Sequence, residues 1–168
     1  MSVRFDKNAF LQSYEAHADA IYRHCFFRVW RKELAEELVQ ETFMRAWGYA
    51  NDGGKIDNMR AFLYRTATNL IIDNSRKKKE ASLEEVLENN PALEPADLGA
   101  APIEQNIILN DVRRALSDLP DEERELLTLR YIEDLDPKEI AEILKISPNN
   151  VSVRLNRAAE KIKQIVNP

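Results

Sequence analysis

The stretch from Asp136 to Lys163 reads DPKEIAEILKISPNNVSVRLNRAAEKIK and contains two helix starts close together. Asp136-Pro137 and Ser147-Pro148 each place a capping side chain before a proline at the first helical position. Apolar residues follow both starts at helical spacing. Two short helices joined by a tight turn are typical of a helix-turn-helix, whose second helix lies in the DNA major groove.

The packing of this motif can be inferred from its small and apolar residues. Ala141 lets the second helix cross closely, Ile146 fills the turn, and Val151 and Leu155 pack inward. On or beside the outer face of the second helix remain side chains suited to base edges and phosphates: Asn149, Asn150, Ser152, Val153, Arg154, Asn156 and Arg157. Lys145 stands where a turn glycine is common, at some conformational cost. The alternative is an ordinary helical hairpin within a bundle.

The composition favours an all-α protein without a cofactor. Of 168 residues, 44% are hydrophobic and only 4 are glycine, and sustained β-type alternation is missing. Cys25, His17 and His24 form no cluster with metal-ligand spacing, so we expect neither a metal nor a cofactor. The N-terminus lacks an apolar signal core, and no run of eighteen apolar residues could span a membrane. We therefore expect a cytoplasmic protein without a membrane partner.

Charge divides the chain into three parts. The net charge is −5, but residues 1–79 carry +4, residues 80–112 carry −8 and residues 113–168 carry −1. The segment 80–102, EASLEEVLENNPALEPADLGAAP, combines this acidity with proline and glycine breakers and predicts a flexible linker. We therefore predict one helical domain over residues 1–79 and a second over residues 103–168.

Apolar periodicity predicts the helices of both domains. The N-terminal domain is expected to contain three, over residues 10–29 and 32–49 and from Asp57 or Asn58 to the basic run Arg76–Lys79. The C-terminal domain is expected to contain four helices, over residues 103–116, 122–132, 137–144 and 148–165.

Several segments in order resemble the extracytoplasmic-function sigma factors of bacterial RNA polymerase, in the sigma-70 family. They are AEELVQETFMRAW (35–47), AFLYRTATNLIID (61–73), LP (119–120), LLTLRY (126–131), EIAEIL (139–144) and VSVRLNRA (151–158). The resemblance covers almost the whole chain apart from the linker. It implies a sigma region 2 bundle of three or four helices, then a region 4 helix-turn-helix.

The resemblance also implies roles for individual residues of the first domain. The helix from Glu37 to Arg45 is similar to the surface that docks on the polymerase clamp helices, where Glu37, Gln40, Glu41 and Arg45 would supply polar contacts. The loop from Gly48 to Asn58 looks like the one that captures a flipped base of the minus-ten element. Beside it, the residues implied to face the opened strand are Arg65, Asn69, Asp73, Arg76 and Lys77. The alternative is an ordinary solvated helix surface for the 37–45 residues and for Asn69, and a cluster of cations at a helix C-terminus for the Arg76–Lys79 run.

In the second domain, the resemblance assigns the seven outer residues listed above to the minus-thirty-five element. The chain departs from the family pattern at Asn149-Asn150, where Gly then Thr is common, and at Ser152, where a basic residue is frequent. Leu135 and Asp136-Pro137 also replace the usual residues. We therefore expect the fold to be shared but the preferred DNA sequence to be this chain's own.

The partners implied are core RNA polymerase, through the clamp helices of the β′ subunit and the flap of the β subunit, together with promoter DNA and an anti-sigma factor. A stand-alone two-domain helix-turn-helix regulator is the alternative, but it would not need the 37–45 helix, and we find no heptad seam for a dimer. An enzyme is disfavoured because no nucleophile–base pair, glycine-rich phosphate loop or metal cluster is evident.

Overall fold

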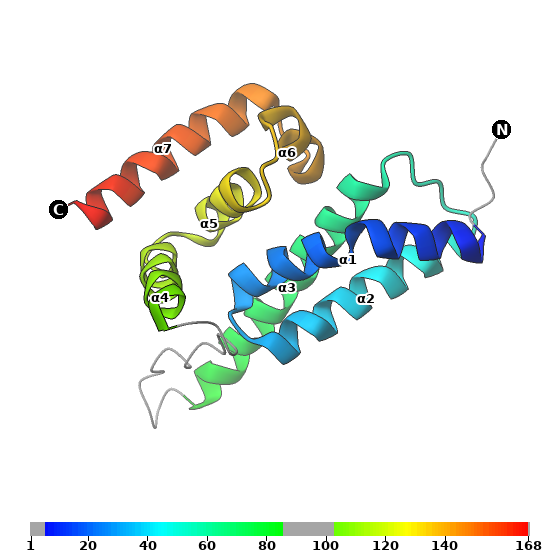
Figure 1. Cartoon of the computed structure of the whole chain (residues 1–168), viewed down its shortest axis with the longest axis horizontal. Coiled ribbons are helices and arrows are strands. Elements are labelled where there is room, and N and C mark those ends of the chain that lie inside the picture. The colour runs from blue at the N-terminus through cyan, green and yellow to red at the C-terminus, as the bar shows by residue number, and fades with distance from the viewer. Residues whose placement is uncertain (1–5, 86–102, 168) are drawn as a thin grey trace.

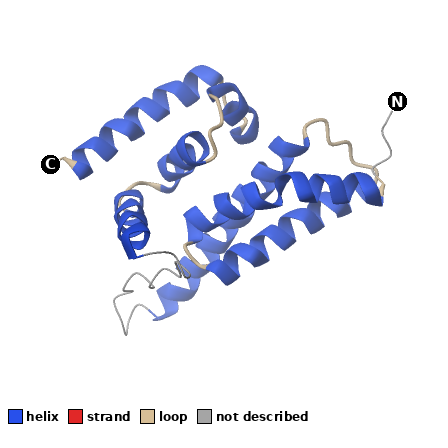
Figure 2. Ribbon diagram, viewed as in Figure 1, coloured by secondary structure: helices blue, strands red, loops and turns tan. Residues whose placement is uncertain are grey.

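A computed structural model describes residues 6–85 and 103–167, and within these ranges every regular element is a helix (Figure 2). In the N-terminal domain, α1 (Lys7–Val29), α2 (Lys32–Asn51) and α3 (Met59–Glu85) lie side by side as a bundle (Figure 1). Apolar side chains buried in this bundle include Ile21, Leu38, Phe43, Leu63, Leu70 and Ile71. The predicted all-α class is confirmed.

Local capping explains where the three helices begin and end. The Asp6 carboxylate accepts from the Ala9 amide at 2.7 Å and starts α1, which ends at Trp30 in a left-handed conformation with φ +57°. The Asn58 side chain accepts from the Ala61 amide at 3.1 Å and starts α3. Asn58, rather than Asp57, therefore makes the capping hydrogen bond of α3.

The helix α3 continues to Glu85, beyond the basic run at which we expected it to stop. No glycine or proline occurs between Arg76 and Glu85, so the helical backbone meets no local breaker. The first six residues of the segment assigned to the linker are thus helical, while its remainder, residues 86–102, lies outside the described residues.

The C-terminal domain contains α4 (Ile103–Ser117), α5 (Asp121–Leu127), a π-helical turn η1 (Thr128–Ile132), α6 (Pro137–Leu144) and α7 (Pro148–Val166). Its core holds Leu126, Leu129, Leu135, Ile140, Val151 and Leu155. The helix expected over residues 122–132 changes to the wider π geometry after Leu127, and the Glu133 amide donates to the Thr128 carbonyl at 3.0 Å. Such wide turns often occur at functional positions.

The two domains pack against each other. The face formed by α5, η1 and α6 lies on α1 and α3, whereas α7 runs along the outer side of the C-terminal domain (Figure 1). In the described part of the chain, no helix has the length and apolar character needed to cross a membrane.

Candidate nucleic-acid interface

The segment from Asp136 to Lys163 has the predicted helix-turn-helix geometry. Asp136 and Glu139 form a capping box, with backbone–side-chain distances of 2.8 and 2.9 Å, and Pro137 follows the cap. Ser147 accepts from the Asn150 amide at 3.1 Å, ahead of α7. Lys145 adopts the left-handed conformation, φ +56° and ψ +45°, that its place in the turn predicted.

Most of the predicted DNA-reading residues on α7 are exposed to solvent. Exposed side chains are Asn149, Ser152, Val153, Asn156 and Arg157. Asn150 and Arg154 are only half-exposed, because the Arg154 Nε donates to the Asn150 Oδ1 at 3.0 Å. Arg154 also approaches Glu122 of α5 at 3.5 Å, so it turns from the outer face towards the rest of the protein.

The residues predicted to meet the opened strand lie along α3, but in unequal environments. Asn69, Arg76 and Lys77 are exposed, and Arg76 pairs with Asp73 one turn away. Arg65 instead donates through Nη2 to the Glu142 carbonyl at 2.8 Å and through Nε to the Ile143 carbonyl at 3.3 Å. These carbonyls belong to the last turn of α6, where backbone oxygens lack helical partners and attract a cation.

The loop between α2 and α3 is held against an aromatic pair. Gly53 adopts φ +91°, and a side chain at Gly54 would overlap the ring of Tyr49. The Tyr49 and Phe62 rings have centroids 5.1 Å apart, and Tyr49 remains 48% exposed. The loop expected to capture a base therefore has a defined shape with an open aromatic ring beside it.

The face of α2 predicted to dock on polymerase is solvent-accessible. Glu37, Gln40 and Arg45 are exposed, and the Arg45 Nε lies 3.1 Å from the Glu41 carboxylate. Met44 lies on the same face and is 67% exposed. Sequence reasoning missed this methionine, although its spacing of three and four residues from Glu41 and Gln40 places it among them.

A cavity of about 660 Å³ lies between the two domains. Its lining includes Arg65, Asn69 and Ile72 of α3, and Lys145 and Arg154 from the helix-turn-helix. Residues predicted to read the two different promoter elements thus face one another across a single cavity.

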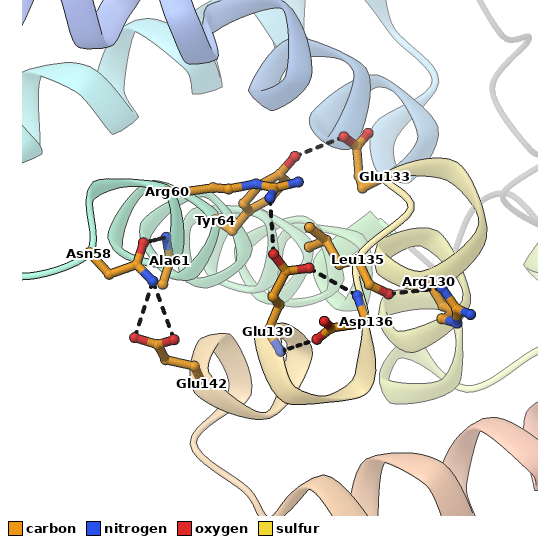
Figure 3. A network of polar contacts seen from close by, with 10 residues as sticks. All are labelled: Asn58, Arg60, Ala61, Tyr64, Arg130, Glu133, Leu135, Asp136, Glu139 and Glu142. Carbon is orange, nitrogen blue, oxygen red and sulfur yellow. Dashed lines mark hydrogen bonds and ion pairs between the residues drawn. The ribbon is translucent and has the colours of Figure 1, made fainter.

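Two buried carboxylates of the C-terminal domain hold the domains together. Glu133 receives Arg23 Nε at 2.9 Å, Arg23 Nη2 at 2.8 Å and the Tyr64 hydroxyl at 2.8 Å (Figure 3 shows the Tyr64 contact). Burial, together with the Glu133 charge, raises the pKa of Tyr64, so its hydroxyl stays protonated and donates.

The second carboxylate, Glu125, is also enclosed by the N-terminal domain. It lies 3.1 Å from His24 Nε2, 2.8 Å from Arg28 Nη1 and 2.9 Å from the Thr68 hydroxyl. Burial favours its neutral form, but His24 and Arg28 outweigh that effect and lower its pKa to about 2. A charged Glu125 is therefore built into the contact between the domains.

A more exposed part of the contact joins α6 to the start of α3. Arg60 Nη1 donates to Glu139 at 3.1 Å, and Asn58 Nδ2 lies 3.2 and 3.3 Å from the two oxygens of Glu142 (Figure 3). None of these interdomain partners was predicted as a site residue except Arg65. Acidic residues in a separate domain carry no local sequence signal that tells which cations they meet.

A second hollow, of about 480 Å³, lies on the C-terminal domain between α4, η1 and α7. Its lining is mainly apolar and includes Val112, Leu127, Ile162 and Val166. Tyr131, at its edge, is 67% exposed. This groove therefore exposes an apolar surface.

Known proteins are similar to this chain in sequence and in fold. Residues 13–81 match the family described as Sigma-70 region 2, and residues 109–162 match Sigma-70, region 4. The chain is 34% identical to the ECF RNA polymerase sigma factor SigM of Bacillus subtilis, covering 92% of this chain and 93% of that protein. It is 29% identical to SigW of the same organism, covering 95% and 89%.

Among solved structures, the chain resembles the sigma factor RpoE from Bartonella quintana, in complex with the anti-sigma factor NepR, with TM-score 0.70 and 21% identity over 94% of this chain and 96% of that one. It also resembles CnrH, in complex with the cytosolic domain of CnrY, with TM-score 0.73 and 22% identity over 96% and 90%. These likenesses concern the fold. The sequence matches show that the chain belongs to the extracytoplasmic-function sigma factors of RNA polymerase, within the sigma-70 family.

Proposed function

We propose that this alternative sigma factor docks on core RNA polymerase through α2, reads the minus-thirty-five element with α7 and holds the opened minus-ten strand with α3. The observation that supports the proposal is that each domain exposes polar and basic side chains on one helix, α3 or α7, and that α2 has an exposed face as well. A promoter-specificity subunit needs all three, whereas a stand-alone regulator needs only the surface on α7.

The α7 surface supports base and phosphate contacts. Asn149, Ser152 and Asn156 can donate to or accept from base edges, and Arg157 can pair with a guanine edge or a phosphate. All four side chains are exposed. Because Asn149 and Ser152 depart from the common family residues, we expect a minus-thirty-five sequence particular to this chain.

The α3 surface supports contact with a separated strand. Arg65, Asn69 and Arg76 lie on one side of the helix, at spacings of four and seven residues. Two cations flanking an amide can hold phosphates and one base edge. The neighbouring loop, with Tyr49 and Phe62 beside it, supports capture of an unstacked base.

The α2 surface supports docking on the polymerase clamp helices. Met44 provides an exposed apolar contact, and Glu37, Gln40, Glu41 and Arg45 surround it with polar groups. Interfaces commonly combine an apolar centre with a polar rim. The apolar groove between α4 and α7 similarly supports contact with the β-subunit flap.

These roles are binding roles, so the chain acts as a subunit rather than as an enzyme, in the cytoplasm where polymerase works. By analogy with the solved complexes of its structural neighbours, we also expect an anti-sigma partner.

Run-off transcription with purified core enzyme tests the proposal. The chain should co-purify with core and give promoter-dependent transcripts, and Met44→Asp should reduce core binding about tenfold, since it places a charge at the apolar centre of the interface. Lys32→Gln, at the start of the same helix, makes the same change in net charge and is the matched control. A chain that gives no promoter-dependent transcript and binds promoter DNA alone as a dimer would support the stand-alone regulator instead.

A further inference from the structure

Three polar side chains join the beginning of α7 to the first turn of α5. The Arg154 Nε donates to the Asn150 Oδ1 at 3.0 Å, and the Arg154 Nη1 lies 3.5 Å from a carboxylate oxygen of Glu122. Asn150 and Arg154 are one turn apart on α7, so their side chains are neighbours on the helix surface. The guanidinium of Arg154 is therefore held between an acid of α5 and the amide of Asn150.

We propose that Arg154 acts as a positioning residue, which turns the amide of Asn150 so that it offers hydrogen-bond donors to the minus-thirty-five element and selects guanine there. This inference rests on the proposed function, because it names the base that one residue of α7 would read. It changes the role expected of Arg154 from the sequence, which was a direct contact with DNA. Asn150 is also one of the positions where the chain departs from the common family residues.

The direction of the Asn150 amide follows from the chemistry of arginine. A guanidinium carries N–H donors and no acceptor, so the Asn150 atom that faces Arg154 must be the carbonyl oxygen. The other end of the amide is the Nδ2 amino group, which can only donate. Asn150 is half-exposed in the first turn of α7, and the N-terminal residues of a recognition helix usually contact base edges.

The surroundings of Asn150 favour an acceptor on the DNA. A further donor at the Asn150 oxygen would lie beside the positive charge of Arg154, which disfavours it. Asn150, Arg154 and the exposed Arg157 are spaced by four and then three residues, which places them on one side of α7. The N-terminus of a helix also carries a partial positive charge. This side of α7 therefore presents donors and positive charge.

Guanine is the base whose major-groove edge matches this surface. Its O6 and N7 both accept, whereas adenine and cytosine each place an amino donor in the groove, and thymine offers one acceptor beside its methyl group. An unrestrained asparagine commonly pairs with adenine, donating to N7 while its oxygen accepts from N6. Because Arg154 engages that oxygen, Asn150 loses the bond to N6. The preference should shift from adenine towards guanine.

Selection of bound promoters tests the inference in the assembled holoenzyme. The full chain with core polymerase is mixed with duplex promoters whose minus-thirty-five element is randomised, and the bound fraction is sequenced. Asn150→Asp keeps the shape of the side chain and its contact with Arg154 but replaces the amino donor with an acceptor. At one position, the parent chain should prefer guanine about tenfold over adenine, and the variant should prefer cytosine or adenine.

Arg154→Met tests the positioning role. Methionine is also a long unbranched side chain but cannot donate to Asn150, whose oxygen is then able to accept from adenine. At the same position, guanine and adenine should become about equally preferred. Arg154→Lys can still donate to Asn150 and should retain most of the guanine preference. A merely structural role of Arg154 would instead weaken binding without changing the preferred base.

Lys161→Met is the matched control for the loss of charge. Lys161 also joins α7 to an acid of α5, since its Nζ lies 2.6 Å from a carboxylate oxygen of Glu123. The variant removes one positive charge from α7, as Arg154→Met does, but leaves the Asn150 contact intact. It should lower affinity for all sequences alike and keep the guanine preference.

The inference is overturned if Asn150→Asp weakens binding equally for every sequence, because Asn150 would then contact a phosphate. It is also overturned if Arg154→Met keeps the guanine preference or if Lys161→Met abolishes it. A parent holoenzyme that selects no minus-thirty-five sequence would reject the proposed function of α7 together with this inference. A selected sequence in which no position responds to residue 150 would reject the inference alone.

Discussion

The surfaces proposed to read DNA on α7 and on α3 differ in how much of each is exposed to solvent. On α7, Asn149, Ser152 and Arg157 face solvent, whereas on α3 the Arg65 guanidinium is held by carbonyls of α6. The same short helix, α6, supports α7 from one side and covers α3 from the other. The difference teaches that a folded domain can leave one proposed DNA-reading surface exposed while it covers part of the other.

The largest effect is expected from Glu125→Gln. Arg28, whose side chain is only 5% exposed, would stay buried without its carboxylate, which costs about 3 kcal/mol of domain association. The two reading surfaces should then become equally accessible. Interdomain distances by spin-label spectroscopy measure this, and an unchanged distribution would show that Glu125 does not hold the domains.

A smaller effect is expected from Arg157→Ala on α7. Loss of one arginine contact should weaken closed-complex binding by about 1–3 kcal/mol without changing the later opening rate. Electrophoretic mobility shifts of holoenzyme on duplex promoter measure the first quantity. If binding is unaffected, Arg157 points away from DNA in the complex.

Asn69→Ala on α3 should show the opposite pattern. The affinity of the closed complex should change little. The free energy of promoter opening should become less favourable by about 1 kcal/mol, because an amide that holds an unstacked base is lost. Permanganate reactivity of the opened strand follows the change. Equal losses of binding and opening would count against placing Asn69 at that strand.

The smallest effect concerns the turn between α6 and α7. Lys145→Gly should stabilise the C-terminal domain by up to about 1 kcal/mol, because φ +56° is strained for a residue with a side chain. Lys145→Ala is the matched control, since it removes the same charge and keeps the strain. The melting temperatures of the two variants in the full chain measure the difference. Equal melting temperatures would show that the backbone at position 145 is not strained.

Much of this fold follows from local sequence signals. Asp136-Pro137 and Ser147-Pro148 identify both helix starts, and the spacing of Val151 and Leu155 identifies the buried side of α7. The end of α3 was misplaced because a basic run resembles a helix terminus, although Arg76–Lys79 contains no residue that breaks a helix.

The contact between the domains could not be predicted in the same way. Glu125 and Glu133 resemble surface acids in the sequence, yet both are buried, and their cations lie about a hundred residues earlier in the chain. Pairing over that separation depends on the π-helical turn and on how the domains dock. The residues proposed to read DNA on α7 followed from helix packing. Those on α3 were found through a resemblance, which describes a bound state and says nothing of Arg65 held by α6.

The proposed function needs surfaces of both domains on one promoter, while α6 holds Arg65 of α3, so it requires the two domains to separate. A cleavable bis-maleimide that links Asn58→Cys to Glu142→Cys, whose parent side chains are 3.2 Å apart, would hold α6 on α3. Run-off transcription with core enzyme would be measured before and after the linker is cut. The account predicts at least a tenfold loss while linked and recovery on cleavage, whereas equal transcription in both states would contradict it.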